Sequence, residues 1–410
     1  MIKLPFLNKL AKKGSDGENF LAVVFNPFKV YVAYMELVDS NEGGSKAQIV
    51  SAISRFISSD SFFEDGGDDE KIVYVLQEIL QEMEENFSDL PSQAIFGVSS
   101  EFCIDLMSIV RLETSAKDRF TEEQLNELSD QAQKNGFFRA QDILAARKGD
   151  MDTSLELITS VDIFKKIDGG VTRDPIGLEG KELELSWFGS FAEDKYLKKV
   201  QRIAKQLNLK ILTVSSLTYA FYSALYDLNS NYKNCVIINL NTVITEVSVA
   251  FGGGLVGSRF INLGVVSILE QISTKLDLHY DEAEEVLQKY KEGSLDSSIA
   301  VEIQKIIRRF FVVWSQALSM VFTNFSGIKT FSSKVLLTGS GFDIPDIYQL
   351  TSAEPWFKSV PFKSPPTFEK APASNKLKRL TDLTGKSSSL AWTLPLSLSS
   401  VYYELRGEEQ

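Results

Sequence analysis

Residues 236–254 read VIINLNTVITEVSVAFGGG, and the interpretation of the whole chain starts from this stretch. Its apolar runs predict two strands joined by a turn at 240–243. A turn that cradles phosphate needs small residues, because the backbone must approach the ligand closely and adopt positive φ. The turn LNTV has no glycine, whereas three glycines follow the second strand at 252–254. We interpret those glycines as a tight hairpin turn rather than as a phosphate loop.

Composition restricts the class of protein. A chain of 410 residues is too long for one core, so two or more compact units are expected. Its 43 basic and 55 acidic residues give a net charge of −12, which argues against nucleic acid as the main partner. Two cysteines, Cys103 and Cys235, do not support a disulfide framework and suit a reducing cytosol. The single histidine, His279, is expected at the surface or at a helix cap, and no metal site is predicted.

Two apolar segments raise the question of membrane contact. No apolar run approaches the roughly 20 residues of a transmembrane helix, and FFVVW at 310–314 is interpreted as the buried side of a long helix. Residues 5–13 permit a short helix with apolar side chains on one side and lysines beside it. Reversible contact with anionic lipid is one expectation, and a flexible basic tail or docking on the protein's own surface is the alternative. The side chains concerned are Phe6, Leu7, Leu10, Lys12 and Lys13.

The order of predicted elements suggests a duplicated plan. Strands are predicted at 19–37 and 48–56, followed by a helix at 71–87 and a strand at 92–100. The same strand and helix order returns from 235 onward, with helices at 265–276, 283–290 and 298–325. Between the two copies, helices are predicted at 121–134 and 138–147, with strands after them. We expect 101–190 to form a compact α+β module on the first domain, and 363–389 to be loosely packed.

Three segments resemble one family. DPIGLEGKELEL at 174–185, EAEEVLQKY at 282–290 and VLLTGSGFDIP at 335–345 are similar, in order and spacing, to motifs of FtsA-type division proteins. The resemblance extends over about 18–405 and places the chain in the FtsA/PilM group of the actin-like ATPase superfamily. It implies a duplicated, ribonuclease H-like two-domain α/β fold with an inserted α+β subdomain in the FtsA position.

The resemblance also implies a division of the chain into seven parts. These are a basic amphipathic segment (1–17), a first core subdomain (18–100), the inserted subdomain (101–190), the first part of the second core subdomain (191–264), a helical subdomain (265–325), the remainder of the second core subdomain (326–390), and a C-terminal core element with its tail (391–410).

The phosphate motifs of the family are degenerate here. Its second motif, Asp-Ile-Gly-Gly-Gly-Thr-Thr-Asp, matches NLNTVITE at 239–246, so all three glycines and the first carboxylate are lost. Its first motif matches VFNP at 24–27, and proline has no N–H to offer a phosphate. The lysine of the base-contacting helix corresponds to Leu287, and Ser340 replaces the middle glycine of the adenosine turn. A remnant nucleotide pocket would contain Asn26, Asn239, Asn241, Thr245, Glu246, Glu284, Gly339 and Gly341.

These changes favour a protein without catalysis. We expect no catalytic residue, no metal and no cofactor, with weak binding of ATP and magnesium as the alternative. The resemblance implies an adaptor of cell division, cytoplasmic and peripheral at the inner face of the membrane, that binds FtsZ-type filaments and self-associates. A PilM-like component of a type IV pilus platform is the second hypothesis, favoured by the N-terminus, whereas DPIGLEG favours FtsA. An active actin-like ATPase is the third.

Overall fold

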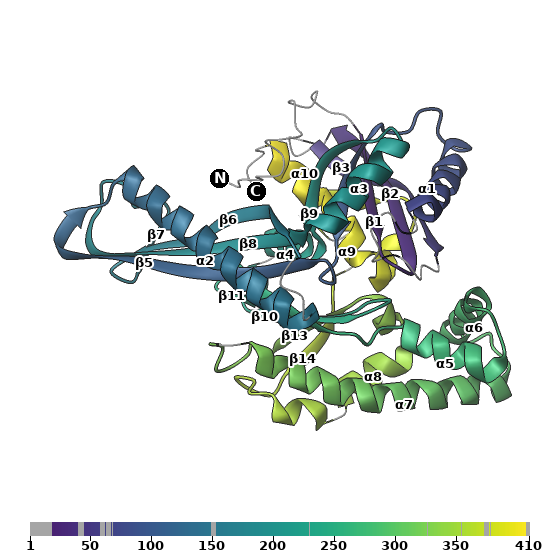
Figure 1. Cartoon of the computed structure of the whole chain (residues 1–410). Helices are drawn as coiled ribbons and strands as arrows, with labels where there is room; N and C mark the ends of the chain where they lie inside the picture. The colour runs from purple at the N-terminus through teal and green to yellow at the C-terminus, as the bar shows by residue number, and fades with distance from the viewer. Residues whose placement is uncertain are drawn as a thin grey trace.

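Two β-sheets organise the chain, and the same strand plan occurs in both (Figure 1). The computed structural model describes residues 19–39, 45–57, 62, 67, 69–148, 153–228, 230–325, 327–353, 355–372, 377 and 379–406. The first sheet contains, in spatial order, β3 (Ser45–Phe56), β2 (Lys29–Asp39), β1 (Phe20–Phe25), β4 (Gln93–Val98) and β9 (Lys210–Ser216). The second contains, in the same order, β12 (Gly254–Ile261), β11 (Thr245–Phe251), β10 (Cys235–Leu240), β13 (Lys334–Thr338) and β14 (Thr367–Lys370).

The pairing directions of the two sets are identical. In each, the first two junctions are antiparallel and the next two are parallel. The central strands β1 and β10 are continuous apolar runs, FLAVVF and CVIINL, and every residue of both is buried. Such runs are typical of strands covered on both faces. The predicted fold class, a duplicated α/β architecture, is confirmed.

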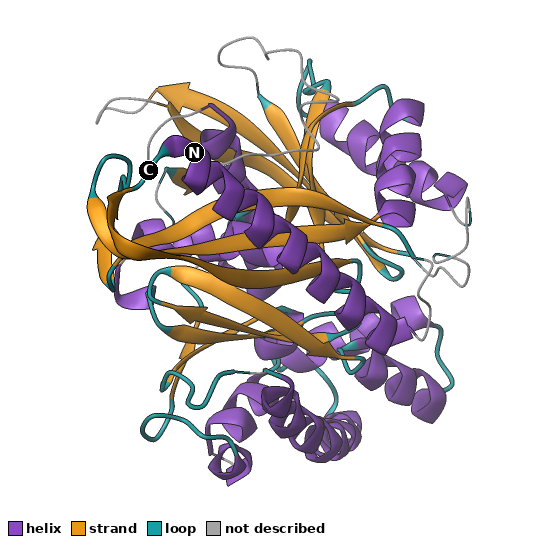
Figure 2. Cartoon of the chain, turned by 60° about the vertical axis from the view of Figure 1, so that its left-hand side comes forward, coloured by secondary structure: helices purple, strands orange, loops and turns teal. Residues whose placement is uncertain are grey.

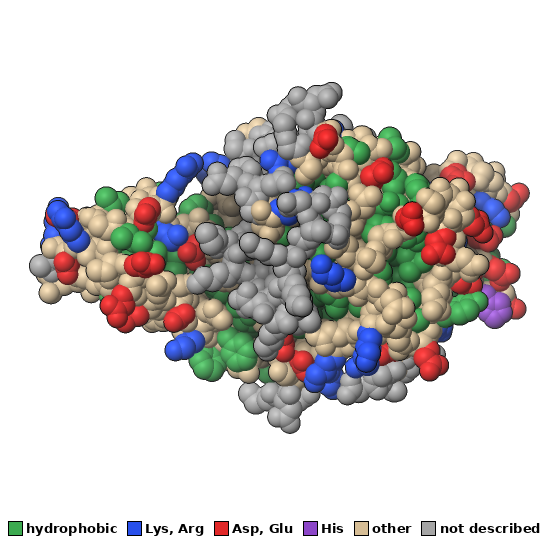
Figure 3. Space-filling model, turned by 90° about the horizontal axis from the view of Figure 1, so that it is seen from above, with side chains coloured by type: hydrophobic (Ala, Val, Ile, Leu, Met, Phe, Trp, Pro, Cys, Tyr) green, Lys and Arg blue, Asp and Glu red, His purple; other side chains and the backbone are tan. Residues whose placement is uncertain are grey.

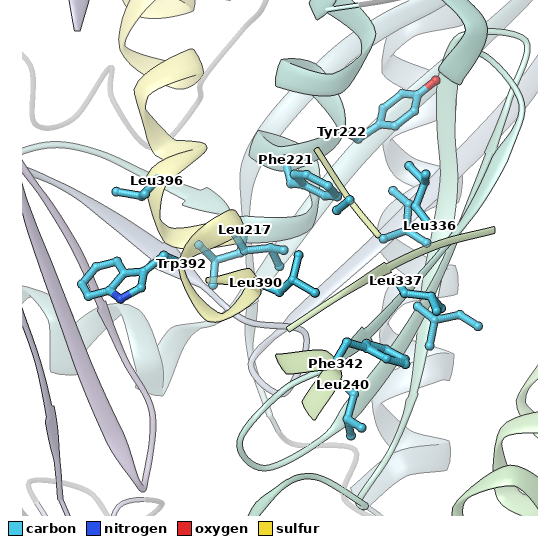
Figure 4. Packing of buried hydrophobic residues seen from close by; sticks show 14 of the residues in the cluster. Leu217, Phe221, Tyr222, Leu240, Leu336, Leu337, Phe342, Leu390, Trp392 and Leu396 are labelled. Atoms are coloured by element: carbon cyan, nitrogen blue, oxygen red, sulfur yellow. The ribbon is translucent and has the colours of Figure 1, made fainter. Parts of the chain in front are cut away.

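Helices cover the sheets as their apolar periodicity predicts. On the first sheet, α1 (Asp69–Glu84) and α3 (Asp194–Gln206) share a core with β1 and β4. A second core joins both sheets through α4 (Leu217–Leu228), and Figure 4 shows Leu217, Phe221 and Leu336 within it. The predicted hairpin turn is confirmed, since Gly252 and Gly253 have φ of 67° and 98° between β11 and β12.

The helical subdomain consists of α5 (Val266–Leu276), α6 (Tyr280–Glu292) and α7 (Ser297–Val321). Exposed His279 is the N-cap of α6, and its backbone N–H donates to the Glu282 carboxylate at 2.9 Å, which confirms the capping role. In the described part of the chain, the helical stretch Ser297–Asn324 alone is long and apolar enough to cross a membrane. Phe310, Phe311 and Trp314 are nevertheless buried in the core, as predicted. The last helix of this region, α8 (Pro345–Ala353), packs beside α7.

The inserted segment has its own core, but it differs from the prediction in two respects. It contains β5 (Cys103–Arg119), α2 (Glu122–Lys148), β6 (Leu155–Ile167), β7 (Gly170–Thr172) and β8 (Glu179–Glu193). The first difference is that α2 is one continuous helix, not two (Figure 2). A Cβ at Gly136 would lie 2.6 Å from the ring of Trp187, so this glycine serves close packing inside the helix rather than a helix end.

The second difference concerns the position of this module. Strand β5 pairs with β12, so β5, β8, β6 and β7 extend the second sheet to nine strands. The expectation that the module lies on the first domain is therefore wrong. Alternation of apolar residues predicts a strand but not which edge it joins. Figure 1 shows the module projecting from the body as a long arm.

The C-terminal residues return to the first domain. Strand β15 (Leu380–Asp382) pairs with β3, so part of 326–390 lies in the first sheet, and 363–389 is not wholly irregular. After it, α9 (Thr393–Leu396) and α10 (Leu398–Arg406) cover this domain. The ring of Tyr402 stacks on Phe20 at 4.6 Å. The N-terminal segment with Phe6, Leu7, Leu10, Lys12 and Lys13, and the tail at 407–410, lie outside the described residues.

Candidate functional site

A cavity of about 350 Å³ lies in the cleft between the two domains. The first domain contributes Lys29 and Tyr31 from β2, and the helical subdomain contributes Glu284 and Lys291 from α6. The other side chains and turns around it include Ser54, Phe56, Thr242, Leu287, Ser340, Asp343, Ser389 and Trp392. Of the eight residues predicted for a remnant nucleotide pocket, Glu284 lines this cavity.

In the first phosphate turn, backbone N–H groups donate to the side chain of the turn's own asparagine. The Asn26 side-chain oxygen accepts the backbone N–H groups of Phe28 and Lys29, both at 2.9 Å. The Asn26 N–H donates to the Lys29 carbonyl at 3.0 Å. A phosphate at this turn would need those same N–H groups. These N–H groups therefore already have an acceptor within the turn.

In the second phosphate turn, internal hydrogen bonds to backbone carbonyls occupy N–H groups of the turn and of the following helix. The N–H of Asn241 donates to the Ile244 carbonyl at 2.9 Å. At the start of α5, the N–H groups of Val265 and Val266 donate to the carbonyls of Asn241 and Thr242, at 3.0 and 2.8 Å. The free N–H groups of a helix N-terminus are what makes it an anion site. Here these two are occupied by the preceding loop.

The surviving glycines serve packing. A Cβ at Gly339, whose φ is 94°, would lie 2.4 Å from the Asn239 side-chain oxygen. A Cβ at Gly341 would lie 2.2 Å from the side chain of Leu240. The turn after β13 therefore lies directly against the end of β10, and Figure 4 shows Phe342 close to Leu240 there. Close contact between two strand ends explains both glycines without a ligand.

Thr245 and Glu246 of β11 point to opposite faces of the strand, and neither lines the cleft cavity. The Thr245 hydroxyl donates to the Leu263 carbonyl at 2.6 Å and accepts the Trp314 indole N–H at 2.8 Å. On the opposite face of the strand, the Glu246 carboxylate accepts hydrogen bonds from Thr218 at 2.7 Å and from Ser248 at 3.1 Å. Both side chains are buried and have partners within the protein.

Side chains of the protein join the two halves of the cleft. Lys29 Nζ lies 2.6 Å from Glu284 Oε1, and the Tyr280 ring of α6 lies 6.1 Å from Phe56 and 6.4 Å from Phe28. We call these five residues the interdomain clamp. Burial alone would lower the pKa of Lys29, but Tyr31 and Glu284 outweigh it and raise that pKa. The carboxylate that the resemblance gives to a nucleotide is thus paired with a lysine of the first domain.

Lysines and an aspartate complete the cleft, and sequence reasoning missed them. Burial lowers the pKa of Lys291, although Asp343 and Glu284 oppose the shift. Asp343 accepts the Ser389 hydroxyl at 2.7 Å and the Leu390 N–H at 3.0 Å, and so holds the C-terminal segment against the turn after β13. Lys29 lies two residues after the first phosphate motif, and Lys291 directly follows the segment EAEEVLQKY at 282–290, so the position of each next to a motif could have indicated it.

The residues present do not fit ATP with magnesium. The N–H groups of Phe28, Lys29 and Asn241 are used internally, and the two positions at which the resemblance expects metal-associated acids hold Val24 and Asn239. Within the described part of the chain, no three side chains of His, Cys, Asp or Glu gather to hold a metal ion. No reaction step is derived for the cleft.

Comparison with solved structures identifies the fold. No family model matches the chain, and no curated protein sequence matches it. Among solved structures, the chain is similar to one described as a PilM-PilN type IV pilus biogenesis complex. The identity is 14%, the TM-score is 0.61, and the match covers 95% of this chain and 99% of that one. The chain has the actin-like ATPase fold.

Other actin-like proteins match at lower similarity. The ethanolamine utilization protein EutJ from Carboxydothermus hydrogenoformans shares 9% identity at a TM-score of 0.48, covering 96% of this chain and 93% of that chain. MreB 5 of Spiroplasma citri, bound to AMPPNP, shares 10% identity at a TM-score of 0.45, covering 96% and 98%. At such identities the likeness concerns the fold.

Proposed function

We propose that this protein is a non-catalytic actin-like scaffold that binds a protein partner in the manner of PilM, as a cytoplasmic component of a type IV pilus-like assembly platform. The observation that carries the first part is the internal closure of both phosphate turns by Asn26 and by the carbonyls of Asn241 and Thr242. The similarity to a PilM-PilN complex along nearly the whole of both chains supports the second part.

The adaptor of FtsZ-type filaments is the weaker hypothesis. It depends on the resemblance of 174–185 to FtsA, and the solved structures named above give it no support. Self-association remains compatible with an actin-like fold, since filament contacts need no surviving acid in the cleft.

Nucleotide binding and partner choice can be measured separately. Thermal-shift and calorimetric titrations with ATP and magnesium are expected to give no affinity tighter than about 10 μM. Pull-downs should then compare a PilN-type peptide with an FtsZ-tail peptide, and capture of the first alone is expected. Steady phosphate release, or capture of the FtsZ tail alone, would contradict the proposal.

Membrane contact by Phe6, Leu7, Leu10, Lys12 and Lys13 stays a prediction of the sequence. Sedimentation with anionic vesicles should compare the full chain with a chain that starts at Gly17. Equal pelleting of both proteins would end this hypothesis.

A further inference from the structure

A second cavity, larger than the cleft, lies where the inserted module meets the second domain. Its volume is about 940 Å³, and it shares no lining residue with the cleft. Strand β5 contributes Met107 and Ile109, helix α2 contributes Arg139, and the remaining wall comes from β11, β12 and the loop before β13. We call this cavity the module groove. Its other lining residues include Val249, Phe251, Val256, Ile328, Lys329, Phe331, Lys334 and Lys363.

The module groove is apolar and open to solvent. Val249 and Phe331 are buried in its wall, with 4% and 2% of their surface exposed. Phe251 and Ile109 are apolar residues that remain 68% and 48% exposed. Large apolar side chains left in water beside a concave surface are typical of binding sites.

The charged side chains that line the module groove are all basic. Four basic residues line the groove, and no aspartate or glutamate is among its described lining residues, although the chain carries a net charge of −12. Lys334 lies 3.8 Å from Glu369, whereas no ion-pair partner for Lys329 or Lys363 is found within the described residues. By contrast, acidic and basic side chains are interspersed across the face shown in Figure 3. The groove therefore complements a ligand that is both acidic and apolar.

The backbone beside the groove favours an extended ligand. Among the described residues, the pairing of β5 with β12 is limited to Leu106 and Gly257. At the next position, the Met107 carbonyl accepts a hydrogen bond from the Arg139 guanidinium at 3.0 Å, so a side chain has replaced a strand partner. Beyond that point the edge of β5 faces the groove, and an exposed strand edge can pair with an added peptide strand.

We infer that the module groove is a docking site for an extended peptide segment of a partner protein, with alternating acidic and apolar residues. The apolar side chains pack against Val249, Phe251 and Phe331, and the carboxylates approach Lys329 and Lys363. This inference does not depend on a pilus partner, because a PilN-type peptide that binds elsewhere on the protein leaves it unchanged.

A selection experiment on the full chain tests the inference without a known partner. A displayed library of random 12-residue peptides is selected on the immobilised protein and, in parallel, on the double variant Lys329→Glu/Lys363→Glu. Lys210→Glu, at an exposed site on β9 that does not line the groove, is the control for the change of charge. The most enriched peptide is then synthesised with a fluorescent label and titrated by anisotropy against each protein and against Phe251→Ser.

The wild-type selection is expected to enrich aspartate and glutamate together with apolar residues. Binding should weaken by about tenfold or more in the double variant and in Phe251→Ser, should not change in Lys210→Glu, and should fall with added salt. Circular dichroism verifies that each variant is folded. Selection without enrichment of acidic residues, or peptides that bind the double variant equally well, overturns the inference. So does binding of anionic lipid vesicles at the groove without peptide binding.

Discussion

At the residue scale, a group of buried acids lies outside the cleft. Glu101 precedes β5 and accepts a hydrogen bond from the Ser99 hydroxyl at 2.6 Å. Burial raises the pKa of Glu101 to about 7, and the charge of Glu246 adds to this shift. Burial likewise raises the pKa of Asp105, which accepts the Ser216 hydroxyl at 2.7 Å, to about 6. Two carboxyl groups at the junction of the domains and the module thus keep their protons to a higher pH than exposed carboxyl groups do.

The substitution Glu101→Gln should remove part of the pH dependence of stability. Because the folded pKa is raised, the folded state binds this proton more tightly than the unfolded state, so its stabilising contribution is present below the ordinary pKa and is lost as the pH rises to about 7. Each pKa unit corresponds to about 1.4 kcal/mol. The variant should therefore unfold at a higher temperature than the wild type at pH 8, with a smaller difference at pH 5. Glu85→Gln, at an exposed site, should show neither effect, and a lower melting temperature of Glu101→Gln at pH 8 would contradict the prediction.

Thr245→Val should destabilise the protein. The change keeps the shape of the side chain but removes the hydrogen bond to the Leu263 carbonyl and leaves the Trp314 indole N–H without its partner in the core. An unsatisfied buried donor costs about 1–3 kcal/mol of the free energy of unfolding. Urea unfolding followed by tryptophan fluorescence measures the loss. Exposed Thr330→Val is the control, and equal stability of the two variants would show that Thr245 does not have this role.

At the element scale, the interdomain clamp should couple β2 to α6. A double-mutant cycle with Lys29→Met and Glu284→Gln is expected to give a coupling free energy of about 0.5–1 kcal/mol, because the pair is partly screened by solvent. High salt should reduce it. The exposed pair of Glu302 and Lys305 within α7 serves as the reference and should couple more weakly. A clamp coupling no larger than this reference would contradict the prediction.

The elements also show what the sequence could and could not predict. Continuous apolar runs predicted β1 and β10, and the structure contains both strands. The loss of the motif glycines still supports only a prediction, that the two turns do not bind phosphate. The break predicted between the helices at 121–134 and 138–147 contains Gly136, and a glycine that packs against Trp187 inside a helix has the same sequence signal as one that ends a helix. The placement of Thr245 and Glu246 in a pocket failed for a related reason. Matching by motif position does not register that neighbouring strand residues point to opposite faces.

Long-range pairing was the part that local patterns could not supply. The junction of β5 with β12 and the return of β15 to β3 join residues far apart in sequence, and neither carries a local motif. The module groove exists because of the first junction, so sequence reasoning had no means of finding it.

At the scale of the whole molecule, the C-terminal return should make the two domains unfold together. A chain that ends at residue 372 loses β15, α9 and α10, and with them the contacts of Tyr402 with Phe20 and of Trp392 with Tyr31. Each large side chain buried there contributes about 1.5–3 kcal/mol. We expect this truncated chain to be insoluble or to lack a cooperative thermal transition, whereas a chain that ends at Arg406 should melt as the full protein does. A soluble truncated chain with a sharp transition at the original temperature would contradict the prediction.

The pairing of β15 with β3 also has a consequence for biosynthesis. Strand β3 (Ser45–Phe56) is translated before the second domain, but its outer neighbour Leu380–Asp382 is translated only after β10 to β14 of that domain. While the residues between these two strands are being translated, the nascent first sheet therefore has an open edge, which can pair with other nascent chains. This edge is completed only once Asp382 has left the ribosome, and until then it is a site at which a chaperone that holds nascent chains can bind.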